Sequence, residues 1–140
     1  EGLTYTLPAG YGVWTFDPDS GLALLRDPAA DLNLRIERKG LNDRFTVNSD
    51  YPEKETMASG AILQWEYAEF ITGSKYYVLY GRVTLPNAYV VLGISTGSKS
   101  GDKSVDKDVG LALFRKVAGS VRVTGPRCIG DCKPGVLKPN

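Results

Sequence analysis

The sequence predicts an α+β protein, with an antiparallel β-sheet, a C-terminal helix packed on one face of the sheet and a short helix elsewhere. The first observation is a run of three long alternating segments, separated only by turn-forming pairs, so that neighbouring strands should pair antiparallel. These segments are residues 61–71, 75–85 and 88–95, and the turns are Gly73-Ser74 and Pro86-Asn87. The second observation is a wide apolar surface at helical spacing after residue 104, which is typical of a helix that packs flat on a sheet.

Shorter strands are expected earlier in the chain, over residues 3–7, 12–16, 22–26 and 32–37. The first runs into a turn at Pro8-Ala9-Gly10. The second and third form a hairpin around Asp17-Pro18-Asp19-Ser20-Gly21, because proline fixes φ and glycine accepts a positive φ. In the fourth, Leu32, Leu34 and Ile36 alternate with polar residues, which indicates a half-buried strand.

The segment before the long strands has another character. Asp50 can cap a helix, Pro52 suits a first helical turn, and the two glutamates that follow favour the positive end of a helix. Gly60 would end it. The sequence therefore predicts a short helix from Pro52 to Ser59.

The three long strands have one apolar face and one polar face. The apolar face consists of Leu63, Trp65, Tyr67 and Ile71, then Tyr77, Leu79, Val83 and Leu85, then Ala88, Val90, Leu92 and Ile94. The polar face is rich in tyrosine and carries Gln64, Glu66, Tyr76, Tyr80, Arg82, Thr84, Tyr89 and Ser95. This face is either covered in part by a second helical layer, for which the short helix is a candidate, or open for binding.

The C-terminal helix is expected to begin at a Ser104 cap, with Asp106 and Asp108 in its first turn. Its apolar residues form two stripes, Val109, Leu113, Val117 and Val121, and Leu111, Phe114 and Ala118. We expect Leu113 of the helix and Trp65 of the sheet to lie in the core.

Length and composition limit the classes of protein. The 140 residues indicate one α+β domain, assigned to residues 1–124, followed by a Pro/Gly-rich tail, residues 125–140. The charge sum of 17 − 16 = +1 gives no general attraction to nucleic acid or to an anionic membrane. Histidine is absent, which removes the commonest general base and the usual zinc ligand, so we expect no metal and no cofactor. No apolar run reaches the ~18 residues that a membrane helix needs.

The two cysteines, Cys128 and Cys132, lie close together in the tail. A redox pair normally has two intervening residues, and a zinc site would need two further ligands, so a structural disulfide is the expectation. A disulfide implies an oxidising compartment. The sequence starts at Glu1-Gly2 and its one methionine is Met57, so we expect that a secretory signal was removed and that the protein is periplasmic or secreted.

The order of elements resembles a known family. A start of Tyr5-Thr6-Leu7-Pro8-Ala9-Gly10-Tyr11, followed by short strands, a helix, a three-stranded meander and a closing helix, is similar to the PsbP/DcrB-like α/β/α sandwich of small extracytoplasmic proteins. The resemblance spans Leu3 to Val123, and small exported immunity proteins are similar α/β domains. It implies a binding, assembly or inhibitory module whose function lies in a protein-binding surface. It assigns no site residues, and the hairpin at residues 17–21 and the cysteine tail do not match the family.

Three short patterns near residue 100 each fail a requirement of the motif they approach. Three residues separate the glycines of residues 97–104 where a phosphate-binding loop needs four intervening residues, and Asp102 adds negative charge. The S-x-x-K patterns that start at Ser100 and Ser104 lack the partner motifs of penicillin-binding enzymes. Asp102, Asp106 and Asp108 do not follow the order of a calcium loop.

The first hypothesis for function is an exported, non-enzymatic module that binds another protein, such as an immunity protein that inhibits a secreted toxic enzyme. Its expected contacts lie in a Gly/Ser/Lys loop and on the tyrosine-rich face: Ser98, Lys99, Ser100, Asp102 and Lys103, and Tyr76, Tyr80 and Arg82. The loop has no apolar anchor and is longer than its connection requires, and tyrosine and arginine are enriched at binding hot spots. A mobile loop with no role is the alternative.

Two other classes of function remain open. A domain that binds a small ligand or a cell-envelope component would show a deep, mostly apolar pocket with a few convergent polar groups. A hydrolase would need two facing carboxylates, and the sequence singles out no such pair, because Glu66 and Glu69 should point to opposite faces of one strand.

Overall fold

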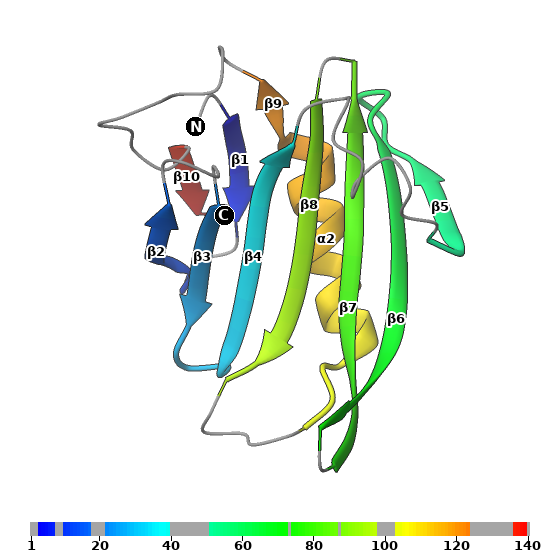
Figure 1. Ribbon diagram of the computed structural model, residues 1–140. Helices are drawn as coiled ribbons and strands as arrows, with labels where there is room; N and C mark the ends of the chain where they lie inside the picture. The colour runs from blue at the N-terminus through cyan, green and yellow to red at the C-terminus, as the bar shows by residue number, and fades with distance from the viewer. Residues whose placement is uncertain are drawn as a thin grey trace.

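The computed structural model of the chain describes residues 3–7, 10–17, 22–39, 51–72, 74–86, 88–97, 103–123 and 136–139. Its elements are β1 (Leu3–Leu7), β2 (Gly12–Asp17), β3 (Leu22–Asp27), β4 (Leu32–Lys39), β5 (Glu53–Thr56), β6 (Ile62–Thr72), β7 (Ser74–Leu85), β8 (Ala88–Thr96), α2 (Lys107–Ser120), β9 (Arg122–Val123) and β10 (Val136–Pro139). Within these residues a seven-stranded sheet has the order β2-β3-β4-β8-β7-β6-β5 and a three-stranded sheet the order β10-β1-β9 (Figure 1). The predicted α+β class is confirmed.

The large sheet is antiparallel throughout. The predicted meander is confirmed, because Thr72 pairs with Ser74 across β6 and β7, and Leu85 pairs with Ala88 across β7 and β8. The other edge of β8 pairs with β4, where Leu34 lies opposite Ile94. This pairing joins the N-terminal strands to the meander in one continuous sheet.

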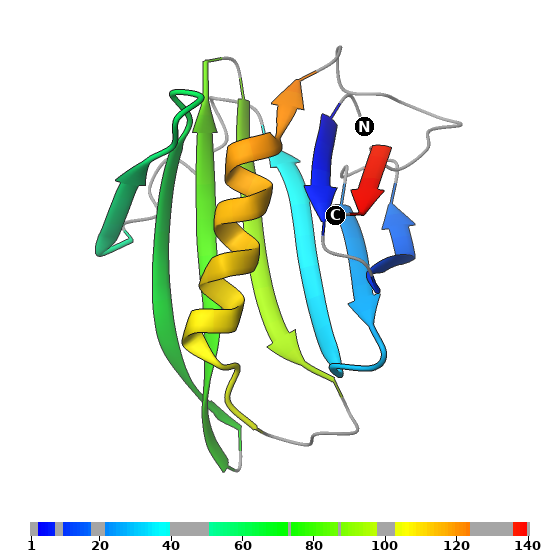
Figure 2. The ribbon, with the colours of Figure 1, turned by 180° about the vertical axis from the view of Figure 1, so that it is seen from behind.

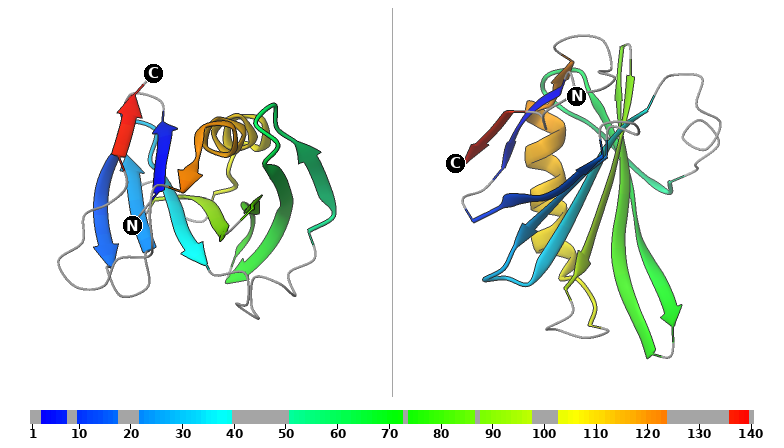
Figure 3. Two further views of the ribbon diagram at one scale, coloured as in Figure 1. Left: turned by 90° about the horizontal axis from the view of Figure 1, so that it is seen from above. Right: turned by 60° about the vertical axis from the view of Figure 1, so that its left-hand side comes forward.

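The helix α2 and the small sheet lie on the same face of the large sheet (Figures 2 and 3). Strand β1 runs beside α2, and the backbone N–H of Thr6 donates a hydrogen bond of 2.8 Å to Oγ of Ser120 at the end of the helix. Leu3 and Tyr5 of β1 are buried in the same core as the sheet. We call the opposite face of the large sheet the outer face.

The core lies between α2, β1 and the inner face of the large sheet. Trp65 and Leu113 are both buried there, as the sequence predicts. The largest fully buried side chains come from the sheet, from α2 and from the residues before it: Phe114, Leu25, Leu34, Ile36, Leu63, Leu79, Leu92, Ile94, Val83, Val90 and Val105.

The predicted short helix from Pro52 to Ser59 is wrong, because residues 53–56 form strand β5. A turn at residues 57–60 returns the chain onto β6, with Met57 N donating to Ala61 O at 2.8 Å and Gly60 at φ 89°. The ladder with β6 outweighs the local helix signals of this segment. Its charged side chains suit the edge of a sheet, where they discourage pairing with other chains.

The predicted cap of the C-terminal helix is wrong as well. Ser104 Oγ accepts a hydrogen bond of 2.9 Å from the N–H of Tyr77, and Val105 N donates to Tyr77 O at 2.9 Å. These bonds hold residues 104 and 105 against β7, so the helix begins later. Asp106 is the N-cap, and its Oδ1 accepts from Val109 N at 3.0 Å. Val109, expected on the apolar stripe, is 54% exposed at the edge of the buried surface of α2.

The tail, assigned to residues 125–140 after the α+β domain, contributes a strand to the small sheet. Residues 136–139 form β10 and pair in parallel with β1, from Thr4 with Val136 to Leu7 with Pro139. The boundary between residues 124 and 125 stays a prediction. The predicted second helical layer loses its candidate, because the segment expected to supply it forms strand β5. Among the described helical residues no segment is long and apolar enough to cross a membrane.

Candidate functional site

A hollow of about 330 Å³ lies on the outer face over β4, β8 and β7. It is lined by Leu24, Asn33, Arg35, Val78, Tyr80, Gly93, Ile94 and Ser95. Gly93 lies at its centre, since the sheet register places Arg35 opposite Gly93 on one side and Tyr80 opposite it on the other. Residues directly opposite in an antiparallel pair share a face, so both side chains flank the glycine.

The absent side chain of Gly93 makes the hollow. A Cβ at this position would lie 3.7 Å from Cδ1 of Tyr80 and 3.8 Å from Cβ of Arg35, at ordinary van der Waals distance. Tyr80 is 41% exposed and the Arg35 side chain is 52% exposed. The hollow thus has an aromatic wall, a cationic wall and a floor that includes the buried Val78.

The charge of Arg35 is balanced only in part. Its Nη2 lies 3.3 Å from Oε1 of Glu37, a carboxylate whose side chain is 6% exposed. Nζ of Lys39 lies 3.2 Å from the same oxygen. Two cations therefore share one carboxylate, and this group of three carries a net positive charge.

The polar rim of the hollow is held in place by a second ion pair. Arg26 Nη2 lies 2.5 Å from Oδ1 of the buried Asp31, and Arg26 Nη1 donates to Oδ1 of Asn33 at 2.7 Å. Asp31 also accepts at its backbone oxygen from Gly97 N at 2.7 Å. A side chain at Gly97 would collide with Arg26 and Asp31, which explains the glycine at this position.

The predicted contact residues of the tyrosine-rich face have different environments. Tyr80 lies in the hollow and is exposed, whereas Tyr76 is half-buried further along the same strand face. Arg82 is 8% exposed, so little of its surface is available to a partner, and its role as a contact residue stays a prediction. It donates to Oε1 of Gln64 at 2.7 Å, and its guanidinium carbon lies 5.1 Å from the ring centroid of Tyr89. Arg82 thus holds neighbouring side chains of the sheet together.

The predicted loop joins the outer face at one end of the sheet. Ser98, Lys99, Ser100 and Asp102 lie outside the described residues, and Lys103 is exposed. The two stems of the loop are tied to each other, because the Thr96 hydroxyl donates to the backbone oxygen of Lys103 at 2.9 Å. Ser95, next to the first stem, lines the hollow. The first stem of the predicted loop therefore lies next to the hollow.

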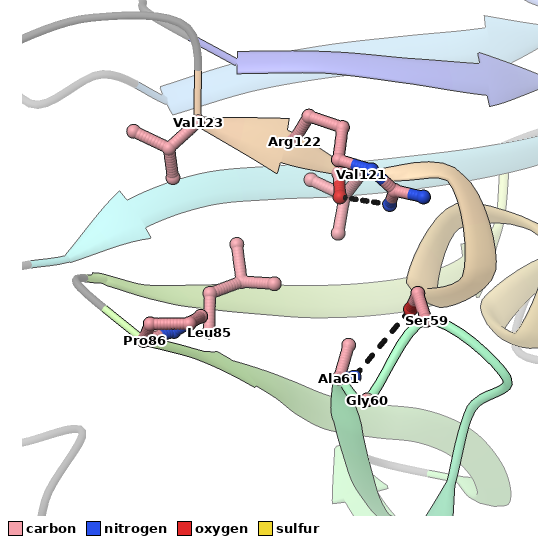
Figure 4. A pocket seen from close by; sticks show the side chains of 8 residues that line it. All are labelled: Ser59, Gly60, Ala61, Leu85, Pro86, Val121, Arg122 and Val123. Carbon is pink, nitrogen blue, oxygen red and sulfur yellow. Dashed lines mark hydrogen bonds between the residues drawn. The ribbon is translucent and has the colours of Figure 1, made fainter.

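A second, larger pocket lies at the other end of the molecule, between β9, the turn before β6 and the end of β7 (Figure 4). Its volume is about 590 Å³, and it is lined by Ser59, Gly60, Ala61, Leu85, Pro86, Val121, Arg122 and Val123. Its walls are mostly apolar. Arg122 Nη1 donates to the backbone oxygen of Val121 at 2.7 Å, which fixes this cation near the end of α2.

A smaller pocket of about 280 Å³ lies beside α2 and includes Tyr11, Asp27 and Val109. Burial, and second the charge of Asp27, raise the pKa of Tyr11 from its usual 10.0 to about 12. No cluster of three or more metal-binding side chains occurs in the part of the chain that the structure describes. Both cysteines lie outside that part, so the disulfide stays a prediction.

Sequence reasoning missed the centre of the hollow, namely Arg35 and Gly93. One signal was present, since a glycine inside an otherwise apolar strand often marks a site of close approach. The pairing of β4 with β8 was needed to bring Arg35 beside it. No protein-family model, curated protein or solved structure matches this chain.

Proposed function

We propose that this protein is a non-enzymatic module that binds another protein with its outer face, and that the hollow over Gly93 is the centre of the contact. The observation that supports this most is the exposure of Tyr80 and Arg35 around an unfilled space on a rigid sheet. Tyrosine and arginine are the residue types that dominate binding energy when they flank a pocket. The adjoining loop, with its tied stems, would extend the same surface.

The finer proposal is an exported immunity protein that blocks a secreted toxic enzyme. It is supported by the absence of histidine from the sequence, by the close pair Cys128 and Cys132, and by the resemblance to PsbP/DcrB-like proteins. In this proposal the lysines and serines of residues 98–103 enter an acidic cleft of the enzyme. A toxin gene beside the gene of this protein would support the finer proposal.

The experiment is a purification of the tagged protein from its native source, followed by measurement of the affinity for a stoichiometric partner. We expect Gly93→Val, which fills the hollow, and Tyr80→Ala to weaken binding at least tenfold. Thr84→Val is the matched control, because it adds an apolar side chain to the outer face of β7 beyond the lining of the hollow. Equal affinities for all four proteins, with equal thermal stability, would refute this docking surface.

A second candidate is a domain that binds a small ligand or a cell-envelope component. The pocket of about 590 Å³ supports it, because ligand pockets have volumes of roughly 300–1,000 Å³ and mostly apolar walls. Native mass spectrometry of the protein from its source distinguishes the two proposals. A bound small molecule favours the pocket, and a bound protein chain favours the outer face.

A further inference from the structure

The hollow on the outer face has one kind of charge. Arg35 is the charged side chain in its lining, and the other lining residues are neutral: Leu24, Asn33, Val78, Tyr80, Gly93, Ile94 and Ser95. The carboxylate beside it, Glu37, is buried and lies within 3.3 Å of both Arg35 and Lys39. An approaching group therefore meets the cation of Arg35, whose counter-ion Glu37 is buried and is shared with Lys39.

The guanidinium of Arg35 has capacity for a stronger partner. It carries several N–H donors, and its hydrogen bond to Glu37 is long, at 3.3 Å. A carboxylate from outside could accept two parallel hydrogen bonds, which is the strongest geometry for arginine. With half of the side chain exposed, Arg35 can reach such a group without leaving the sheet.

The space beside Arg35 suits an apolar side chain. Its floor is the backbone of Gly93 with Val78 and Leu24, and its wall is the ring of Tyr80. A volume of about 330 Å³ lies at the small end of the range for ligand pockets, so it accommodates one large side chain more readily than a whole cofactor.

We infer that the hollow binds an acidic and apolar segment of a partner protein, with an apolar side chain over Gly93 and a neighbouring carboxylate on Arg35. This inference rests on the proposed function and names the chemistry of the partner. The exposed Lys103, at the same end of the sheet, adds a second cation for an acidic surface. Charge complementarity selects this occupant, because a basic segment would place a second cation against Arg35.

The probe is a phage-displayed library of random heptapeptides, selected on the full chain. We expect enriched peptides to carry Asp or Glu within two positions of Leu, Ile, Phe or Trp. A synthetic enriched peptide should lose affinity by roughly 10- to 100-fold on Arg35→Gln, as expected for a charged hydrogen bond. Its Kd should rise with salt for the wild type and much less for Arg35→Gln. Lys54→Gln, which removes an exposed cation of β5, is the charge control.

Gly93→Val separates failure of this inference from failure of the proposed function. In one outcome, Gly93→Val loses peptide binding while the peptides selected on Arg35→Gln remain as acidic as those selected on the wild type. That result would overturn the inference and retain the docking surface. Equal binding of the peptide to Gly93→Val and to the wild type would also overturn the inference, whereas the docking surface is refuted only if the native partner binds Gly93→Val and Tyr80→Ala as tightly as the wild type. Absence of any enriched peptide would overturn the inference alone, because the native partner is measured independently. Thermal unfolding of each variant shows whether a loss reflects binding or folding.

Discussion

The ring of Phe114 lies directly against the backbone of Gly81. A Cβ on Gly81 would be 2.9 Å from Cε2 of Phe114 and 3.0 Å from the backbone oxygen of Gln64. Phe114 is fully buried at the centre of α2, and Gly81 lies in the middle of β7. This contact sets how closely the helix approaches the sheet, because neither the ring nor the strand can yield without disturbing the core.

Gly81→Ala should therefore lower the free energy of unfolding by about 1–3 kcal/mol, the usual cost of overpacking a core. Denaturant unfolding measures the change. Gly93→Ala is the matched control on the neighbouring strand, since its Cβ would make only contacts of 3.7 Å or more. We expect this control to leave stability unchanged or slightly raised. Equal effects of the two substitutions would contradict the packing described here for Phe114.

Leu113→Ala should lower the free energy of unfolding by about 2–5 kcal/mol, because it leaves a cavity under α2. Val109→Ala is the control on the same helix, where the side chain is 54% exposed. This control should change stability by less than about 0.5 kcal/mol, because the side chain is at the surface and alanine favours helix. A loss of less than half a kcal/mol for Leu113→Ala would mean that the helix is not docked on the sheet.

Ionisation of Tyr11 should lower the free energy of unfolding at high pH. Its pKa is raised to about 12 by burial and by Asp27, so the folded state retains a proton that the unfolded state loses near pH 10. The stabilisation is complete below pH 10 and is lost as the pH rises to about 12. Since Tyr11 is only half-buried, we expect a contribution of about 1–2 kcal/mol.

The measurement is the free energy of unfolding of the wild type and of Tyr11→Phe between pH 9 and pH 12. The difference between the two proteins isolates Tyr11 from the other tyrosines and lysines that titrate in this range. Parallel curves would show that Tyr11 has an ordinary pKa.

Cys128 and Cys132 should form a disulfide, which a mass increase of two hydrogens on reduction and unfolding would detect. Because β10 pairs with β1, a bond in the connection from β9 to β10 should favour docking of β10 by shortening the connection. Replacing both cysteines by serine should increase amide hydrogen exchange in β10 and leave the core of the large sheet unchanged. An unchanged mass on reduction would disprove the bond.

Replacing residues 98–103 by a Gly/Ser linker of equal length should leave thermal stability nearly unchanged. The stems keep the hydrogen bond that the Thr96 hydroxyl donates to the backbone oxygen of residue 103, because the linker retains that oxygen. Loss of partner affinity in this variant would assign contacts to the loop. Unchanged affinity with unchanged stability would exclude the loop and leave the hollow over Gly93 as the contact.

Local signals in the sequence were sufficient for most of the elements. Alternation over β6, β7 and β8 identified both their strands and their faces, because the side-chain period of a strand is independent of its partners. The helical spacing after residue 106 likewise identified α2 and its buried face. Short turns fixed the antiparallel pairing of neighbouring strands for the same local reason.

The same local signals failed where backbone outside the segment competes. Residues 53–56 carry the features of a helix start, but the edge of the following strand, β6, offers them a ladder. Ser104 has the side chain of a cap, but Tyr77 of β7 uses its hydroxyl as an acceptor. In both cases hydrogen bonds to a strand outside the segment decide the conformation, and no pattern within the segment records them.

The sequence by itself determined the α+β class, the order of the long strands, the apolar face of the meander and the position of Tyr80 on the other face. Tertiary structure alone decided that Arg35 lies beside Gly93, that Arg82 is buried, and that residues 136–139 complete the small sheet. The reason is that periodicity specifies which way a side chain points, whereas pairing between strands distant in sequence specifies which side chains meet. The candidate site depends on such pairings between strands, and so the periodicity of the sequence does not identify it.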